Sequence, residues 1–223
     1  MEFESLNIRD GDGSRRWEEA GRPVVPSLVV DGQALPILHV SQLASLLGIA
    51  APAAEKATRA ASDTVAVLRA WLEHVHAVEW PLLVKPTPSR GRTLRELTVN
   101  VFHPFELLPS AWETGRFDWY PERDAEREAG LDTAEAVGEF AQRAYDGWNV
   151  FLLETGDELD SRDPEIDSPR GTVTYSTLLA AQRWHAAFHY RQLAEFLRRE
   201  GVELRHVLPL ERLVGLELPE EVF

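Results

Sequence analysis

One long segment constrains the fold of this chain more than any other part of it. Over residues 174–200 the apolar side chains recur at helical spacing, and Gly201 offers a natural end to the helix. The same period predicts three further helices, over residues 55–78, from Thr93 through Phe105, and over residues 132–154. Helices of this length, joined by connections of uneven length, predict a mainly α protein built as a four-helix bundle.

The connections between these helices have their own signals. Thr93 and Glu96 have the spacing of a capping box, which marks the start of the second helix. Residues 80–92 contain three prolines and are predicted as a loop. Residues 109–131, rich in Trp, Pro, Arg and acidic side chains, predict an irregular crossover, and residues 155–171 predict another loop.

The first 50 residues differ from the rest and predict a small α/β segment, separate from the bundle in residues 51–223. Residues 51–54 have the composition of a linker. The apolar tail, residues 202–223, is expected to pack along the bundle or on a partner chain. The N-terminal order is helix, strand, hairpin turn, strand and helix, over residues 14–20, 26–30, 31–32, 33–38 and 41–47.

Charge and composition exclude several classes of function. The chain has 223 residues and a formal net charge of −14, and only two of its 23 basic residues are lysines, so binding to nucleic acid or to an anionic membrane surface is not expected. It has no cysteine, which excludes disulfides, thiolate ligands and a cysteine nucleophile. Neither a signal peptide nor a membrane-spanning stretch is visible, so we expect a cytoplasmic protein.

A pair of histidines in the last long helix is the main candidate for chemistry. His185 and His189 lie four residues apart and therefore share one face of the helix, next to apolar positions. Buried imidazoles need a polar partner, and a metal shared with a third ligand would satisfy them. His103, near the middle of the second helix, is the candidate third ligand. The alternative is a chance spacing of two histidines that pack in the core.

Two questions stay open at this point. Pro104 follows His103 directly, which disfavours the α conformation at His103 and predicts a kink that either aims this ligand or displaces it. Neutral imidazole suits zinc, nickel, iron or copper, so the ligand set alone does not select the metal.

Two segments resemble the DinB/YfiT-like superfamily of bacterial metal-binding four-helix bundles. They are Thr93-Leu94-Arg95-Glu96-Leu97 running into His103, and Trp184-His185-Ala186-Ala187-Phe188-His189-Tyr190-Arg191-Gln192-Leu193. The resemblance covers about residues 55–200. It implies a divalent metal held by His103, His185 and His189, with zinc favoured and nickel, iron or manganese as alternatives.

The resemblance also implies a chemistry. Several members of the superfamily resemble transferases or isomerases that use a low-molecular-weight thiol. Three neutral ligands leave the metal its full positive charge, so it can lower the pKa of a bound thiol and hold it as thiolate. An open fourth position is typical of a catalytic site.

A second, shorter resemblance concerns the N-terminal segment. Residues 21–32 and the helix after Leu38 resemble the C-terminal half of a glutaredoxin-like fold. In that family the proline that matches Pro26 lies beside the thiol-binding site. The redox cysteine motif is absent, so a redox role is excluded, and a remnant that helps to bind a thiol or caps the bundle remains.

Several further residues are candidates for the site. Glu106 is a candidate general base or acceptor for an imidazole N–H, and its alternative is a surface glutamate. Tyr190 and Arg191 are candidate catalytic residues, although Arg191 also has the spacing to pair with Glu195. Tyr145 on the third helix is a candidate for facing the metal cavity.

An aromatic cluster and an acidic run lie in the crossover between the second and third helices. Trp112, Phe117, Trp119 and Tyr120 either wall a substrate pocket or plug one end of the bundle, and Trp119 is the candidate for ligand binding. The acidic run over residues 122–128 is expected to be a solvated face.

The hypothesis that follows is a metal-dependent transferase or isomerase that acts on a low-molecular-weight thiol and a second small-molecule substrate. The alternatives are a non-catalytic protein that binds or senses a metal or small ligand, and a metal-dependent hydrolase. The apolar tail makes a homodimer a reasonable expectation.

Overall fold

A computed structural model describes residues 4, 6, 8, 11–23, 27–37, 40–48, 56–88, 91–120, 124–204, 206–213, 215, 216, 218, 219 and 222, except the side chains of residues 40, 41, 45, 210 and 211. The described chain is mainly helical, as the sequence predicts, and contains two small antiparallel sheets. It divides into two compact units, Met1–Ala54 and Glu55–Phe223.

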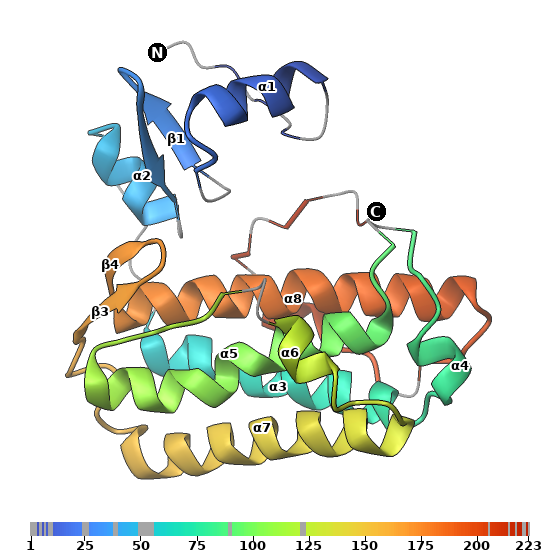
Figure 1. Ribbon diagram of the computed structural model, residues 1–223. Helices are drawn as coiled ribbons and strands as arrows, with labels where there is room; N and C mark the ends of the chain where they lie inside the picture. Colours follow the sequence, from blue (N-terminus) through green and yellow to red (C-terminus); the bar gives the residue numbers. More distant parts are fainter. Residues whose placement is uncertain are drawn as a thin grey trace. The chain divides into compact units, whose positions relative to one another are not determined.

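The first unit has the element order that its sequence predicts. It contains α1 (Gly11–Glu19), β1 (Ser27–Val30), β2 (Gln33–Pro36) and α2 (Val40–Leu46), and the strands pair antiparallel with Val30 opposite Gln33 (Figure 1). The two turn residues both have positive φ, 50° at Asp31 and 79° at Gly32, as a tight hairpin turn of this kind requires. Pro26, a candidate for thiol binding, lies outside the described residues.

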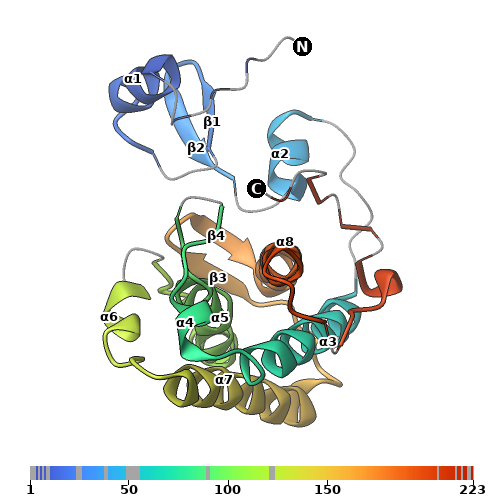
Figure 2. The same cartoon turned by 90° about the vertical axis from the view of Figure 1, so that its right-hand side faces the viewer.

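Four long helices make up most of the second unit. They are α3 (Ala57–Val75), α5 (Leu94–Thr114), α7 (Ala134–Thr155) and α8 (Tyr175–Arg199) (Figures 1 and 2). Their packing closes on itself, because α5 lies on α7, α7 on α3, α3 on α8, and α8 on α5. No described helix is both long and apolar enough to cross a membrane.

Aromatic side chains fill the core between these four helices. Trp71 and Phe102 meet edge to face, and so do Phe105 and Trp148. The largest of these side chains are fully buried and come from all four helices: Trp71, Phe102, Phe105, Trp112, Trp148, Tyr175 and Phe196. Aromatic rings of this size supply a large share of the burial that stabilises a domain.

Side-chain caps explain where three of the long helices begin. Thr93, Thr133 and Thr174 each accept a hydrogen bond from the backbone N–H three residues on. At Thr93 the capping box predicted from the sequence is complete, because the Glu96 carboxylate also accepts from the Thr93 backbone N–H.

The crossover and the loops contain more structure than the sequence predicts. A short helix, α4 (Trp80–Leu83), lies in the proline-containing loop, and α6 (Asp124–Glu128) lies in the crossover. The loop before α8 contains a hairpin of β3 (Glu165–Ser168) and β4 (Gly171–Thr174). A 3₁₀ turn, Leu210–Leu213, lies in the tail.

His103 has the α conformation although the proline that follows it disfavours this conformation. Helix α5 runs through both Pro104 and Pro109 and ends at Thr114, where Gly115 takes the left-handed conformation with φ 72°. His103 is therefore helical, and it stays on the same helix face as Asn100, three residues earlier.

Candidate metal centre

The two histidines of α8 lie side by side on one face of the helix. The centroids of the His185 and His189 rings are 4.6 Å apart and the rings are nearly perpendicular, at 84°. Both side chains are partly buried, and the Nδ1 atom of His185 is buried with no hydrogen-bond partner. An unpartnered buried nitrogen is costly, so it marks this position as a candidate for binding a ligand.

His103 approaches the site from α5 and is held by a buried carboxylate. Its side chain is 11% exposed, and its Nδ1 lies 2.8 Å from Oδ1 of Asp124 on α6, whose side chain is 5% exposed. Asp124 accepts two more hydrogen bonds, from Asn100 Nδ2 at 3.0 Å and from Trp119 Nε1 at 3.3 Å. The expectation that the run over residues 122–128 is entirely a solvated face is therefore wrong at Asp124.

Asn100 joins this group to the histidine pair. Its Oδ1 lies 3.0 Å from Nε2 of His185, while its amide nitrogen donates to Asp124. The result is a continuous hydrogen-bonded chain from His103 through Asp124 and Asn100 to His185, which links α5, α6 and α8.

The partners in this chain determine which imidazole nitrogens carry a proton. An ionised carboxylate only accepts hydrogen bonds, so the Nδ1–H of His103 and the amide N–H of Asn100 must be the donors to Asp124. The oxygen of Asn100 then faces His185, whose Nε2 must be the donor. In neutral imidazoles this leaves the lone pairs on Nε2 of His103 and Nδ1 of His185.

His189 follows the same rule with other partners. Its Nδ1 lies 2.6 Å from Oε1 of Gln192, and Gln192 donates its amide hydrogen to the carbonyl of Val222 at 2.9 Å. A carbonyl only accepts, so the oxygen of Gln192 faces His189, Nδ1 is the donor, and Nε2 carries the lone pair.

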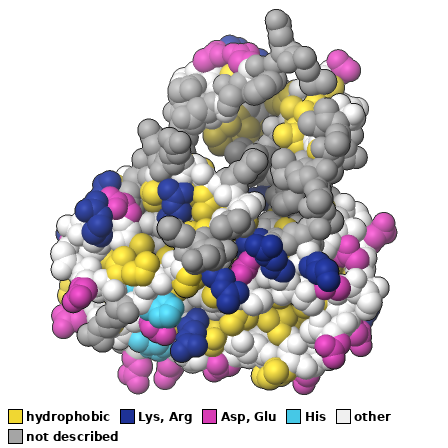
Figure 3. All heavy atoms as spheres, turned by 180° about the vertical axis from the view of Figure 1, so that it is seen from behind, with side chains coloured by type: hydrophobic (Ala, Val, Ile, Leu, Met, Phe, Trp, Pro, Cys, Tyr) yellow, Lys and Arg dark blue, Asp and Glu magenta, His cyan; other side chains and the backbone are white. Residues whose placement is uncertain are grey.

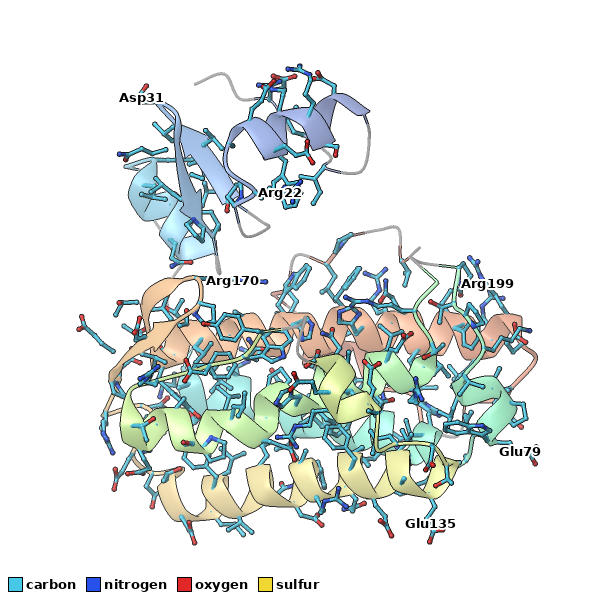
Figure 4. The ribbon with its side chains drawn as sticks, in the orientation of Figure 1. Arg22, Asp31, Glu79, Glu135, Arg170 and Arg199 are labelled. Atoms are coloured by element: carbon cyan, nitrogen blue, oxygen red, sulfur yellow. The ribbon has the colours of Figure 1, made fainter. Side chains whose placement is uncertain are left out.

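The surroundings of His185 favour its neutral form. Burial lowers its pKa well below the usual range, and His189, Arg170 and Arg92 lower it further. Figure 4 shows the Arg170 side chain extending from the turn of the β3–β4 hairpin along the direction of α8. The Trp119 ring packs edge to face on His185 with centroids 5.2 Å apart, so one member of the aromatic cluster reaches the histidines.

The remaining predicted site residues lie in other environments. Glu106 forms an ion pair with Arg127 at 2.9 Å, and the acceptor on His103 is Asp124 rather than Glu106. Tyr145 lies on α7, which packs on α5 and α3, whereas the histidine pair lies on α8.

Both residues that follow His189 contact the tail. The Tyr190 hydroxyl donates to the carbonyl of His206 at 3.0 Å and accepts from the backbone N–H of Leu208 at 3.2 Å. Arg191 donates to the carbonyl of Pro219. Glu195, the other partner considered for Arg191, pairs with Arg198 and Arg199, which lower its pKa to about 2.

The three predicted ligands are not already gathered around one point. Among the described residues, no three histidine, aspartate or glutamate side chains form a group that could hold a metal ion as they stand. The chemistry of the donors fits a metal nonetheless, because each histidine has one N–H held by an acceptor and one nitrogen with a lone pair.

Sequence reasoning identified the histidines and missed most of the groups that hold them. Asn100 lies three residues before His103, and Gln192 three residues after His189, so helical spacing alone could have drawn attention to both. Nothing in the local sequence separates Asp124 from its acidic neighbours.

Comparisons of the chain with protein-family models, curated proteins and solved structures found no match.

Proposed function

We propose that residues 55–223 form a metal-binding four-helix bundle of the DinB/YfiT-like kind. The closed order of packing, from α3 to α8, α5, α7 and back to α3, supports this proposal, because each helix of such a bundle lies against two neighbours. The uneven connections, one of which includes α6, also suit it.

In this proposal His103, His185 and His189 hold one divalent metal, with zinc favoured. The observation that carries it is a hydrogen bond at one nitrogen of each imidazole, from which the position of the proton follows. All three imidazoles donate through one nitrogen to a fixed oxygen, on Asp124, Asn100 or Gln192. Metal-binding histidines have this arrangement in general, because the second N–H bond orients the ring and raises the basicity of the ligand nitrogen.

Metal binding then requires the three side chains to move toward one point, because they are not gathered there as they stand. His185 and His189 already lie in contact on one helix, and the hydrogen-bonded chain already joins His103 to His185.

We further propose that the site activates a low-molecular-weight thiol for transfer to an electrophile. The bound metal would supply positive charge that stabilises the thiolate at neutral pH. Trp119, against His185, would shield the reacting groups from water and help to form the pocket for the electrophile. The positive charges of Arg92 and Arg170, which reach His185, would favour a thiol that carries a carboxylate.

One observation favours a second candidate, a metal-sensing protein. His189 is connected through Gln192 to the carbonyl of Val222 in the C-terminal segment, so occupancy of the site could be transmitted to that segment. A hydrolase is less well supported, because the candidate base, Glu106, is paired with Arg127.

The proposal is tested by metal content and then by turnover. The purified protein is loaded with Zn²⁺, passed through a desalting column and analysed for metal by mass spectrometry. We expect a single bound ion per chain, lost in His185→Ala, His189→Ala and His103→Ala. His76→Ala is the matched control, because His76 is an exposed histidine of the same unit, and it should retain the metal.

Thiol consumption separates the two candidates. The metal-loaded protein is incubated with cellular thiols and a generic electrophile, with and without a chelator. Consumption that the chelator abolishes supports the transferase. Metal binding without consumption of any thiol would contradict the transferase and favour the sensor, and full metal retention in His189→Ala would contradict the site itself.

A further inference from the structure

The buried carboxylate of Asp124 is hydrogen-bonded directly to His103 of α5, and it is connected to His185 of α8 through Asn100. We infer that Asp124 is a positioning residue: through direct contact and through Asn100 it sets which nitrogen carries the proton in both His103 and His185. The consequence for metal affinity rests on the proposed function, whereas the placement of the protons is a property of the metal-free protein.

The first step is the direct contact with His103. Oδ1 of Asp124 lies 2.8 Å from His103 Nδ1 and 3.3 Å from Trp119 Nε1, an indole nitrogen that can only donate. Two donors therefore converge on this oxygen. The proton of His103 stays on Nδ1, and Nε2 keeps its lone pair.

The second step passes through Asn100. The other carboxylate oxygen, Oδ2, accepts from Asn100 Nδ2 at 3.0 Å, which orients the amide so that its oxygen faces His185 Nε2 at 3.0 Å. Asn100 is 5% exposed, so water cannot readily replace these partners. The proton of His185 stays on Nε2, and the buried Nδ1 keeps its lone pair.

The two steps have one consequence for metal binding. Each imidazole presents an unprotonated nitrogen before a metal arrives, so no proton has to be moved from one nitrogen to the other on binding. Loss of such an outer partner typically weakens metal binding by about 10- to 100-fold.

The informative substitution is Asp124→Asn, which keeps the size of the side chain. An amide offers one acceptor oxygen in place of two. Because two donors converge on Oδ1 and one on Oδ2, we expect the amide oxygen at the Oδ1 position and the NH₂ group against Asn100. Asn100 must then turn its own NH₂ group toward His185, which shifts the His185 proton from Nε2 to Nδ1 and leaves His103 unchanged.

Nitrogen-15 NMR of the metal-free protein reads these protons directly, at alkaline pH where the imidazoles are neutral. In the unsubstituted protein we expect the Nδ1–H form of His103 and the Nε2–H form of His185. Asp124→Asn should convert His185 alone. Glu126→Gln is the matched control, since Glu126 is an exposed acidic residue of the same short helix, and it should change neither histidine.

Asn100→Ala tests the second step separately and replaces Asp124→Asn if that variant fails to fold. In this variant the proton of His185 should no longer be confined to Nε2, while the Nδ1–H form of His103 persists. Our inference would be overturned if a folded Asp124→Asn or Asn100→Ala protein kept both histidines in their original forms. It would also be overturned by the Nε2–H form of His103 in the unsubstituted protein.

Metal titration of the same samples distinguishes the two proposals. Weakening of Zn²⁺ binding by about 10- to 100-fold in Asp124→Asn supports both of them. If the unsubstituted protein binds no Zn²⁺ but its proton positions follow Asp124 as described, the proposed function fails and the inference about Asp124 stands.

Discussion

Two carboxylates, Asp63 and Asp124, are buried, and their burial could not be predicted from the sequence. Both are among the least exposed polar residues, yet their neighbours in the chain, Ser62 and Thr64 in one case and Arg123 and Ala125 in the other, do not mark them as buried. The partners of Asp124 lie 21 and 24 residues away, at His103 and Asn100. Helical spacing could identify the histidines because ligand pairs are local, whereas the carboxylate that holds them is brought in by tertiary packing.

Asp63 leads to a prediction about stability. On α3 it forms an ion pair with Arg183 of α8 at 2.8 Å, with side chains 5% and 2% exposed, and a second pair with Arg212 at 3.0 Å. Removing one member of a buried pair leaves the other charge uncompensated. We therefore expect Asp63→Asn to lower the free energy of unfolding by about 3–5 kcal/mol, measured by urea denaturation.

Arg212→Ala provides the comparison, because Arg212 is 44% exposed on its side chain. Its loss should cost no more than about 1 kcal/mol. Equal losses for the two variants would contradict the assignment of the buried charge pair to Asp63 and Arg183.

At the scale of elements, the sequence predicts the long helices well and the short elements poorly. The long helices are marked by extended apolar periodicity and, for α5, α7 and α8, by threonine caps. The β3–β4 hairpin has a single buried residue in each strand, Ile166 and Val173, so no alternating pattern can be recognised. The short α6 has no apolar stripe, because its buried residue is the polar Asp124.

The capping box of α5 gives a prediction for one helix end. Thr93→Ala removes the acceptor for the Glu96 backbone N–H, which the Thr93 hydroxyl oxygen now meets at 3.2 Å. The expected cost is about 1 kcal/mol in the free energy of unfolding. Thr93→Ser should restore most of it, because serine keeps the hydroxyl, and an equal loss in both variants would mean that the cap contributes nothing.

Two glycines inside α7 make a matched pair for a second test. A Cβ at Gly147 meets nothing within 4 Å, whereas a Cβ at Gly138 would lie 2.8 Å from the His76 ring. Gly147→Ala should therefore stabilise the protein by up to about 1 kcal/mol, since alanine is favoured over glycine in helices. Gly138→Ala should gain less, because His76 has to move. Thermal unfolding of both variants measures these changes in stability. A larger gain in stability for Gly138→Ala than for Gly147→Ala would contradict the close approach of Gly138 to His76.

At the scale of the whole second unit, the described part of the C-terminal tail packs on α3 and α8. This is one of the two arrangements expected from the apolar residues of the tail. His74 of α3 and Tyr190 of α8 both bond to the carbonyl of His206, at 2.9 and 3.0 Å, and the side chain of Leu208 is buried. On the face drawn in Figure 3, histidine side chains lie beside acidic ones. His206 makes a contact of this kind, with Nδ1 3.4 Å from Oε2 of Glu73. One of the hydrogen bonds that hold the segment therefore comes from a titratable side chain, His74.

This packing predicts how stability responds to pH. Burial lowers the pKa of His74, and the neighbouring His206 lowers it further, against the opposing effects of the backbone hydrogen bond and of Glu73. In the unfolded chain the group titrates near its usual value of about 6.5, so below that pH the unfolded state binds more protons than the folded state. The stabilising contribution of neutral His74 is thus complete above about pH 6.5 and is lost as the pH falls toward the folded pKa.

His74→Gln tests this, because the glutamine amide can still donate to the His206 carbonyl but does not titrate. We expect the decrease in the free energy of unfolding between neutral and mildly acidic pH to be smaller in this variant, as measured by urea denaturation at a series of pH values. His76→Gln is the control, since His76 is exposed and its replacement should leave the pH dependence as it was. If both variants gave the same pH profile as the unsubstituted protein, the acid sensitivity would belong to other groups and not to the packing at His74.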